Sequence, residues 1–211
     1  IFKIRLAIFL SFLERIEKDL PKNATIFEIG CADGVVFKAI EKKFPERFSR
    51  FVGMDISPKM IEEAKKQNDN PRAIFCVRND TPSEQFDIVI ELGVHASDLQ
   101  TESQYVSDHL KPGGYFFYSY AGSESIYRRI KLKDVAYAEE YQPYAAYESI
   151  LRKFFEIRYE KVYGLFVPKL WKFPSIARAL QPVIDVILER FVPELFHEKL
   201  YVLVKNGEVG L

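Results

Sequence analysis

Apolar and polar positions alternate in two regular ways along the first 120 residues. Short runs of strand-forming residues stand at 25–30, 50–56, 73–77, 86–92 and 115–120. Between them lie segments whose apolar residues have helical spacing, at 35–44, 57–66 and 102–111. Strands that alternate with helices predict right-handed βαβ units. We therefore expect an α/β fold with a doubly wound, mostly parallel sheet.

Two helix starts and one helix end carry local signals. Ser57 is a candidate N-cap, and Pro58 suits the first helical position. Thr101 and Gln104 form a capping-box pattern in front of the helix at 102–111. The sequence Pro-Gly-Gly at 112–114 is expected to break that helix before the fifth strand.

The two ends of the chain complete the expected sheet. Residues 2–20 have the pattern of an amphipathic helix that ends before Pro21. After residue 120 we expect a helix at 144–155 and two further strands, at 156–166 and 198–206. This makes a seven-stranded sheet with a Pro-punctuated, apolar insertion between its last two strands.

Composition narrows the classes of function. The chain has 211 residues, and its 30 Lys and Arg balance 30 Asp and Glu, which argues against a nucleic-acid backbone as partner. Cys31 and Cys76 are interpreted as reduced thiols, and the scattered histidines predict no metal site. Without an apolar run of about 18 residues or a visible signal peptide, a cytoplasmic location is expected.

The stretch IFEIGCADG at 26–34 raises the first functional hypothesis. Glu28 lies near the end of a strand that runs into a turn with Gly30 and Gly34. Glycine permits positive φ and the close approach of a ligand to the main chain. The spacing differs from the dinucleotide pattern G-x-G-x-x-G, because Ala32 holds the middle position and Val35 the place of the third glycine.

A second acidic residue points to the same edge of the sheet. Asp55 ends the second strand, and the carboxyl ends of adjacent parallel strands form the binding crevice of this fold. A carboxylate there can accept both hydroxyls of a ribose. Its other possible role, as cap of the next helix, is already filled by Ser57.

At this point the chain resembles the class I S-adenosylmethionine-dependent methyltransferases. FEIGCADG is similar to their first motif and GMDISPKMIEEAKK to their second, followed by RND at 78–80, FDIVIELGVH and LKPGGYFFYS. The resemblance covers about residues 24–120. It implies a Rossmann-like methyltransferase fold in a single domain, 1–211, with an N-terminal helix at 1–23, a cofactor-binding half at 24–120 and substrate-cap elements at 121–155 and 167–196.

The resemblance also implies which residues meet S-adenosylmethionine. Asp55 takes the ribose position, Met60 lies by the adenosine, and Asp80 is the candidate for the adenine amino group. Ala32 departs from the family's glycine, and we expect it to be tolerated with a negative φ. The full set of cofactor candidates is Glu28, Gly30, Cys31, Ala32, Gly34, Asp55, Ile56, Met60, Asp80 and Glu91.

The chemistry that follows is methyl transfer, in which the cofactor's sulfonium makes its methyl group electrophilic. The protein's main task is then to hold an acceptor atom in line. His95, just after the fourth strand, is the candidate general base where the acceptor must lose a proton, and a hydrogen-bonded loop residue is the alternative. Glu91 is a candidate for contact with the methionine end.

The acceptor side rests on the two cap elements. Residues 121–147 carry five tyrosines, and the insertion 167–196 holds a helix that either packs over the sheet or covers an apolar acceptor. We expect O- or N-methylation of a small, partly apolar, lipid-like or secondary-metabolite acceptor. An RNA or protein methyltransferase and a non-catalytic, cofactor-binding interaction protein stay open, as does peripheral membrane contact around Trp171.

Overall fold

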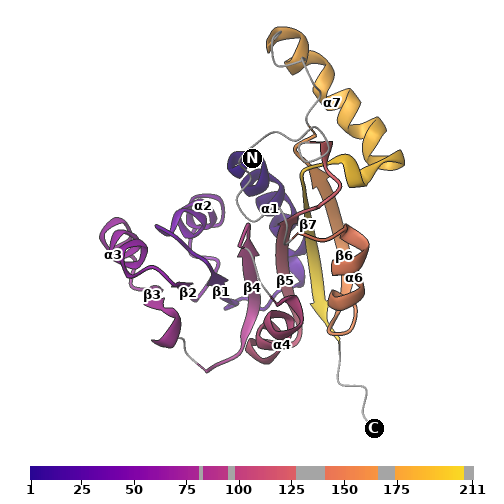
Figure 1. The fold of residues 1–211 in the computed structure, drawn as a ribbon. Coiled ribbons are helices and arrows are strands. Elements are labelled where there is room, and N and C mark those ends of the chain that lie inside the picture. Colours follow the sequence, from indigo (N-terminus) through magenta and orange to yellow (C-terminus); the bar gives the residue numbers. More distant parts are fainter. Residues whose placement is uncertain (81–82, 95–97, 127–140, 166–173, 207–211) are drawn as a thin grey trace.

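One seven-stranded sheet runs through the molecule in the order β3-β2-β1-β4-β5-β7-β6 (Figure 1). The computed structural model describes residues 1–80, 83–94, 98–126, 141–165 and 174–206. Strands β1 to β5 pair in parallel, whereas β7 runs antiparallel to both β5 and β6. The predicted fold class is confirmed. The strands are β1 (Thr25–Ile29), β2 (Arg50–Asp55), β3 (Ala73–Val77), β4 (Phe86–Leu92), β5 (Leu110–Ala121), β6 (Phe155–Tyr163) and β7 (Glu198–Lys205).

Helices cover both faces of the sheet (Figure 1). One hydrophobic core lies under α1, α2 and α3, and a second lies under α4 and α6. Neighbouring residues of a strand point to opposite faces, so Ile26 joins the first core and Phe27 the second. The helices are α1 (Phe2–Ile16), α2 (Val35–Lys43), α3 (Pro58–Gln67), α4 (Leu99–His109), α6 (Tyr144–Leu151) and α7 (Pro174–Phe191), with short turns η1 (Glu17–Asp19), η2 (Arg78–Asp80) and η4 (Pro193–Leu195).

Helix α3 begins as its sequence predicts, but α4 does not. The Ser57 side chain accepts a hydrogen bond from the Met60 amide, and Pro58 is the first residue of α3. In α4 the cap is Asp98, whose carboxylate accepts from the amides at positions 100 and 101. The predicted Thr101 cap is therefore wrong. Asp98 offers two acceptor oxygens, and the earlier start buries Leu99 against the second core.

The Pro-Gly-Gly sequence also has a different role from the predicted one. Helix α4 ends at His109, and β5 already begins at Leu110, so residues 112–114 lie inside the strand. The register between β4 and β5 shifts there, between Phe86 and Ile88. A side chain at Gly114 would lie 3.0 Å from the Asp87 carbonyl oxygen. The glycine thus allows the two strands to approach closely at the irregularity.

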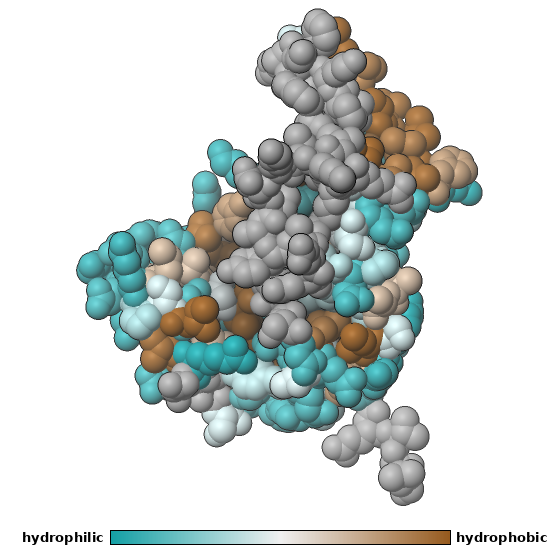
Figure 2. All heavy atoms as spheres, viewed as in Figure 1, coloured by the Kyte–Doolittle hydropathy of each residue, from teal (hydrophilic) through white to brown (hydrophobic). Residues whose placement is uncertain are grey.

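Helix α7 projects from one end of the sheet beside β6 and β7 (Figure 1). Ile184 and Leu188 pack against the second core, and Glu189 forms an ion pair with Lys161 of β6. The outer side keeps an apolar stripe exposed, which is the brown surface along α7 in Figure 2. The stripe consists of Ile176, Leu180, Val183, Ile187 and Phe191. Within the described residues, no helix combines the length and apolarity needed to cross a membrane.

Candidate active site

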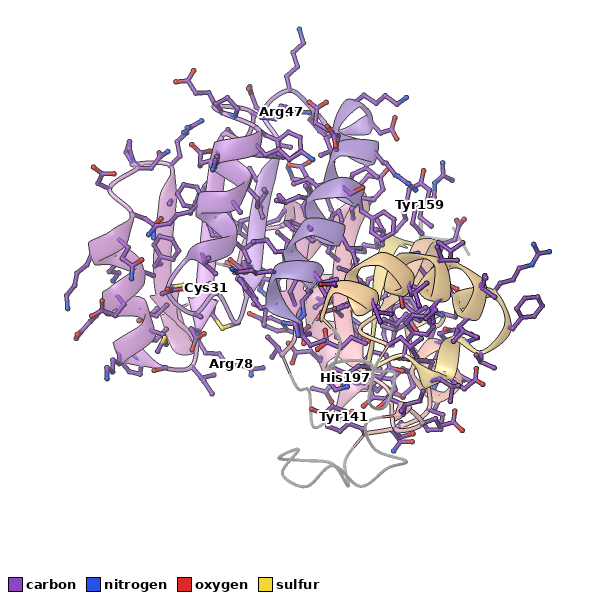
Figure 3. The ribbon with its side chains drawn as sticks, turned by 90° about the horizontal axis from the view of Figure 1, so that it is seen from above. Cys31, Arg47, Arg78, Tyr141, Tyr159 and His197 are labelled. Atoms are coloured by element: carbon purple, nitrogen blue, oxygen red, sulfur yellow. The ribbon has the colours of Figure 1, made fainter. Side chains whose placement is uncertain are left out.

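A pocket of about 460 Å³ opens at the carboxyl ends of β1, β2 and β4. This is the edge at which doubly wound folds bind their ligands. Figure 3 views the molecule from above, with Cys31 and Arg78 on the β1–β3 side and Tyr141 and His197 on the β5–β7 side. The pocket lining is Ile29, Gly30, Met54, Asp55, Ile56, Arg78, Glu91, Val94, Asp98, Thr101 and Glu102.

The glycine turn forms one wall of this pocket. The amides of Gly30 and Cys31 both donate to the Met54 carbonyl oxygen, at 2.8 and 3.0 Å, which ties the turn to β2. Gly30 has φ +74°, and a Cβ there would lie 2.3 Å from Cγ2 of Val94. Only glycine fits at this position, and the bare backbone faces the space where a ligand would lie.

Ala32 does not have the negative φ under which we expected its methyl group to be tolerated. Its φ is +46°, in the left-handed region that non-glycine residues rarely adopt. An alanine there costs about 1–2 kcal/mol. The Ala32 amide donates to Oδ2 of Asp55 at 3.0 Å, and this bond helps to hold the turn in that conformation. The chain therefore keeps the left-handed turn of a glycine-rich loop without the middle glycine.

Asp55 connects the turn to the start of α3. Its Oδ2 accepts from the Ala32 amide, and its Oδ1 accepts from the Ser57 amide at 2.9 Å. The side chain still lines the pocket. An ionised carboxylate has about four lone-pair positions, so two stay available for a ligand. Next to it, Ile56 is 77% exposed on the pocket wall, so a ligand that covered it would gain from burying its apolar surface.

Glu28 and Cys31 lie beneath the turn and not in the pocket. Burial raises the pKa of Glu28 well above its ordinary value, and the negative charges of Asp55 and Asp33 add to this. Oε2 of Glu28 has no hydrogen-bond partner among the described residues. Burial also raises the pKa of the Cys31 thiol, and the Cys31 amide already donates to the Met54 carbonyl oxygen, so Cys31 supports the turn from beneath.

Several other predicted residues are not brought to the pocket. Met60 is 37% exposed on α3 and Asp80 is exposed on η2, and neither belongs to the lining. Gly34, with φ +77°, begins α2 as its N-cap. His95 lies outside the described residues, so its role as a base stays a prediction.

The structure adds residues that the sequence reasoning missed. Arg78 Nη2 donates to Glu102 at 3.5 Å, and its guanidinium lies 5.8 Å from the centre of the Tyr105 ring. This places a cation from η2 and a carboxylate from α4 on the same wall of the pocket. Arg78 belongs to the same RND sequence as Asp80, the residue that we predicted to bind the cofactor. The local sequence does not show that Arg78, and not Asp80, lines the pocket.

Glu91 is the most unusual group in the lining. It is fully buried, and neither of its carboxyl oxygens has a hydrogen-bond partner among the described residues. Burial raises its pKa well above the ordinary value, the nearby Glu102 raises it further, and Arg78 opposes the shift. A buried carboxyl group without donors is costly and calls for a ligand.

A smaller cavity of about 60 Å³ adjoins the first through the shared residue Val94. Four tyrosines dominate its wall, two from β5, one from the segment that leads into α6 and one from α6 itself. Sequence reasoning named Tyr141 and Tyr147 as part of a cap, and both belong to this cavity. The complete lining is Arg5, Gly93, Val94, Tyr118, Tyr120, Ala121, Tyr141, Tyr147 and Glu198.

An ion pair from the two ends of the chain closes this cavity. Arg5 of α1 donates to Glu198 of β7 at 2.7 and 2.9 Å and to the Leu92 carbonyl oxygen at 3.2 Å. Tyr163 also donates to Glu198. The pair is largely buried, with side-chain exposures of 14% and 7%. It fixes α1 against the loop that follows β4.

The insertion does not line either cavity with its described residues. Helix α7 contacts β6 and the second core, at a distance from the glycine turn (Figure 3). The lid prediction is thus not confirmed for α7. Leu170 and Trp171, the residues that we expected to meet the acceptor, lie outside the described residues.

Comparison with known proteins shows which domain and which fold the chain resembles. A family model described as a methyltransferase domain matches residues 27–116. The ribosomal protein L11 methyltransferase of Burkholderia mallei is 27% identical over 104 residues, 48% of this chain and 33% of that protein. A malonyl-[acyl-carrier protein] O-methyltransferase of Ilyobacter polytropus is 38% identical over 72 residues, 32% of this chain and 26% of that protein. The matches thus span a third or less of these curated relatives.

Solved structures extend the likeness to nearly the whole chain. The N-methyltransferase NodS of Bradyrhizobium japonicum, in complex with S-adenosyl-L-homocysteine, aligns with a TM-score of 0.60 at 15% identity over 94% of this chain and 85% of that one. At that identity the likeness concerns the fold. Fold and domain match together define a Rossmann-like methyltransferase. Residues 27–116 match a methyltransferase domain, and the sheet has the fold of the solved S-adenosylmethionine-dependent methyltransferases.

Proposed function

We propose that this chain transfers the methyl group of S-adenosylmethionine to a small-molecule acceptor whose apolar or aromatic part enters the tyrosine-lined cavity. The adjoining cavities carry this proposal. The larger has room for a nucleoside-sized ligand between the glycine turn and α4, and the smaller meets it at Val94. A methyl group passed between two ligands needs such a junction.

The larger pocket offers a matching group for each part of the cofactor. Asp55 is proposed to take the ribose hydroxyls with its remaining lone pairs, and exposed Ile56 to pack against the adenine ring. The bare turn from Gly30 to Ala32 is proposed to lie along the methionine part. When bound, the cofactor supplies an electrophilic methyl group, and the side chains around it hold the acceptor in line and exclude water.

The acceptor class is argued from the second cavity. Tyr118 and Tyr120 come from β5, where alternate residues point to the same face, and the Tyr120 and Tyr147 rings stack with centres 3.7 Å apart. Such a wall suits an apolar group, and at about 60 Å³ the cavity would take only a small part of an organic acceptor, because complete ligand pockets measure ~300–1,000 Å³. A protein acceptor is the second candidate, since one relative is named for methylating ribosomal protein L11 and another for methylating malonyl-[acyl-carrier protein].

Two measurements test the proposed function. Calorimetric titration should give micromolar-range binding of S-adenosylmethionine and its demethylated product, about −8 kcal/mol, and much weaker binding of NAD. Transfer of labelled methyl groups is then assayed against small phenols and amines, and separately against purified protein and RNA fractions. If label appeared only in a protein or RNA fraction, the acceptor would be a macromolecule and the small-molecule proposal would be wrong. Tighter NAD binding would refute methyl transfer altogether.

A further inference from the structure

Five carboxyl groups line the two cavities, and four of them already take donors from the protein. Asp55 accepts two backbone amides, and Asp98 caps α4. Glu102 forms an ion pair with Arg78, and Glu198 forms one with Arg5. Within the described part of the chain, Glu91 alone of the five has no donor on either oxygen. A ligand, an ordered water or a residue outside that part can supply its missing partner, and only a ligand would also use the position of Glu91 between the two cavities.

Glu91 lies at the boundary between the two cavities. In the sheet it pairs with Ile29 of β1 on one side and with Tyr118 of β5 on the other. Ile29 lines the cofactor pocket, whereas Tyr118 lines the tyrosine cavity. Burial raises the pKa of the Tyr118 hydroxyl, and the nearby Glu91 raises it further, which agrees with this proximity. The carboxyl group therefore lies where cofactor and acceptor would meet.

The surroundings of Glu91 favour a cation over a neutral group. Tyr118 is the cross-strand neighbour of Glu91, and its ring lies by Tyr120 on the wall of the adjoining cavity; aromatic surfaces of this kind attract ammonium groups. The cations nearest to the two cavities, Arg78 and Arg5, are each engaged with another carboxylate. A carboxyl group without a donor next to aromatic rings is the combination that recognises an amine.

We propose that Glu91 binds the amino group of the acceptor, so that the substrate class is a small amine carrying an apolar or aromatic group. This inference rests on the proposed methyl transfer. The ammonium group gives one proton to the Glu91 carboxylate, and the neutral nitrogen then forms the N–CH₃ bond. The S–CH₃ bond breaks, and its electron pair stays on sulfur. Glu91 thus touches the reacting nitrogen as a catalytic residue.

The proposal predicts a proton signature as well as an affinity. The groups that face Glu91 are Glu102 on α4, Arg78 on η2 and Tyr118 on β5. Burial and Glu102 raise the pKa of the Glu91 carboxyl group, and Arg78 opposes the rise. An ammonium ligand binds best to the ionised carboxylate, so binding should release about one proton from the protein. A neutral alcohol of the same shape should release none.

Benzylamine and benzyl alcohol are suitable probes, titrated into the protein saturated with S-adenosyl-L-homocysteine. We expect benzylamine to bind about tenfold tighter or more, with proton release measured by calorimetry in two buffers of different ionisation enthalpy. Glu91→Gln should abolish the preference and the proton release while leaving the benzyl alcohol affinity unchanged. Glu156→Gln, on the exposed side of β6, is the matched control that removes a charge elsewhere.

Three results would overturn the inference. The first is equal binding of the two probes to the wild-type protein, a measurement that needs no variant to fold. The second is an unchanged amine preference in Glu91→Gln together with weaker binding of S-adenosylmethionine, which would assign Glu91 to the cofactor. The third is failure of S-adenosyl-L-homocysteine to bind the wild type, which would remove the proposed function first and this inference with it.

Discussion

Replacing Asp55 by alanine should damage the protein in two separable ways. If the Ser57 cap were sufficient for the start of α3, Asp55 would be dispensable for stability. The structure predicts otherwise, because the carboxylate accepts from the amides of both Ala32 and Ser57. Without it, two backbone donors lose their acceptor, and the left-handed Ala32 loses a bond that holds it.

The magnitude follows from these two bonds. A hydrogen bond to a charged group contributes about 1.5–3 kcal/mol, and a half-buried site gives values at the low end because water can replace part of the loss. The total for Asp55→Ala is then about 2–4 kcal/mol of unfolding free energy. In a chain of this size, 1 kcal/mol shifts the Tm by about 2–4 °C, so we expect a fall of roughly 4–16 °C.

Scanning fluorimetry of the ligand-free protein measures the stability part, and calorimetry with S-adenosylmethionine measures the binding part. Asp55→Asn keeps one acceptor oxygen and should lose about half as much stability. Asp69→Ala, in an exposed loop, controls for loss of charge alone. Cofactor affinity should also fall about tenfold or more in Asp55→Ala. An unchanged Tm of the ligand-free Asp55→Ala protein would refute the structural role.

Two further changes test the surroundings of the site. In Gly93→Ala the new Cβ would lie 2.0 Å from Nη1 of Arg5, so the buried ion pair must shift and unfolding by urea should show a loss of about 2–4 kcal/mol. Gly113→Ala shares the positive φ but meets nothing within 4 Å, and should lose only about 1 kcal/mol. Burial alone would raise the pKa of Asp87. The hydrogen bonds from Lys111 and from the amide and hydroxyl of Thr25 outweigh burial, so the pKa of Asp87 is lowered. Wild-type stability should therefore hold above a pH of about 4 and fall as the pH drops through the lowered pKa, and Asp87→Asn should flatten this acid dependence in pH-dependent unfolding.

The cofactor half of the fold could be predicted because its signals are local. The apolar runs at 73–77 and 86–92 became β3 and β4 with the same bounds, and Ser57 and Pro58 begin α3 as expected. Buried parallel strands give such continuous apolar runs, and helix starts depend on a few adjacent residues. Asp55 and Gly30 came together in the pocket because the carboxyl ends of β1 and β2 must meet.

The missed features depend on contacts that no local pattern contains. Arg5 and Glu198 lie at opposite ends of the chain, and only the insertion of β7 between β5 and β6 brings them together. The start of α4 was predicted at Thr101 from its capping-box pattern, but Asp98 is the cap, and the burial of Leu99 that favours this earlier start depends on tertiary contacts. Because side chains alternate between the two faces of a strand, the sequence of β5 could have predicted that Tyr118 and Tyr120 share a face. It could not have predicted the cavity beside them.

The position of Ala32 joins these observations into one physical account of the site. A non-glycine residue in the left-handed region stays there only where its surroundings over-determine it. Here the turn is tied to β2 through the Met54 carbonyl oxygen and to Asp55 through the Ala32 amide. The carboxylate that we propose for the ribose is thus also the group that shapes the turn for the methionine part. Because one side chain would serve both, the proposed sites for the ribose and the methionine part are fixed relative to each other before the cofactor binds, and we propose that this directs the methyl group to the boundary at Glu91.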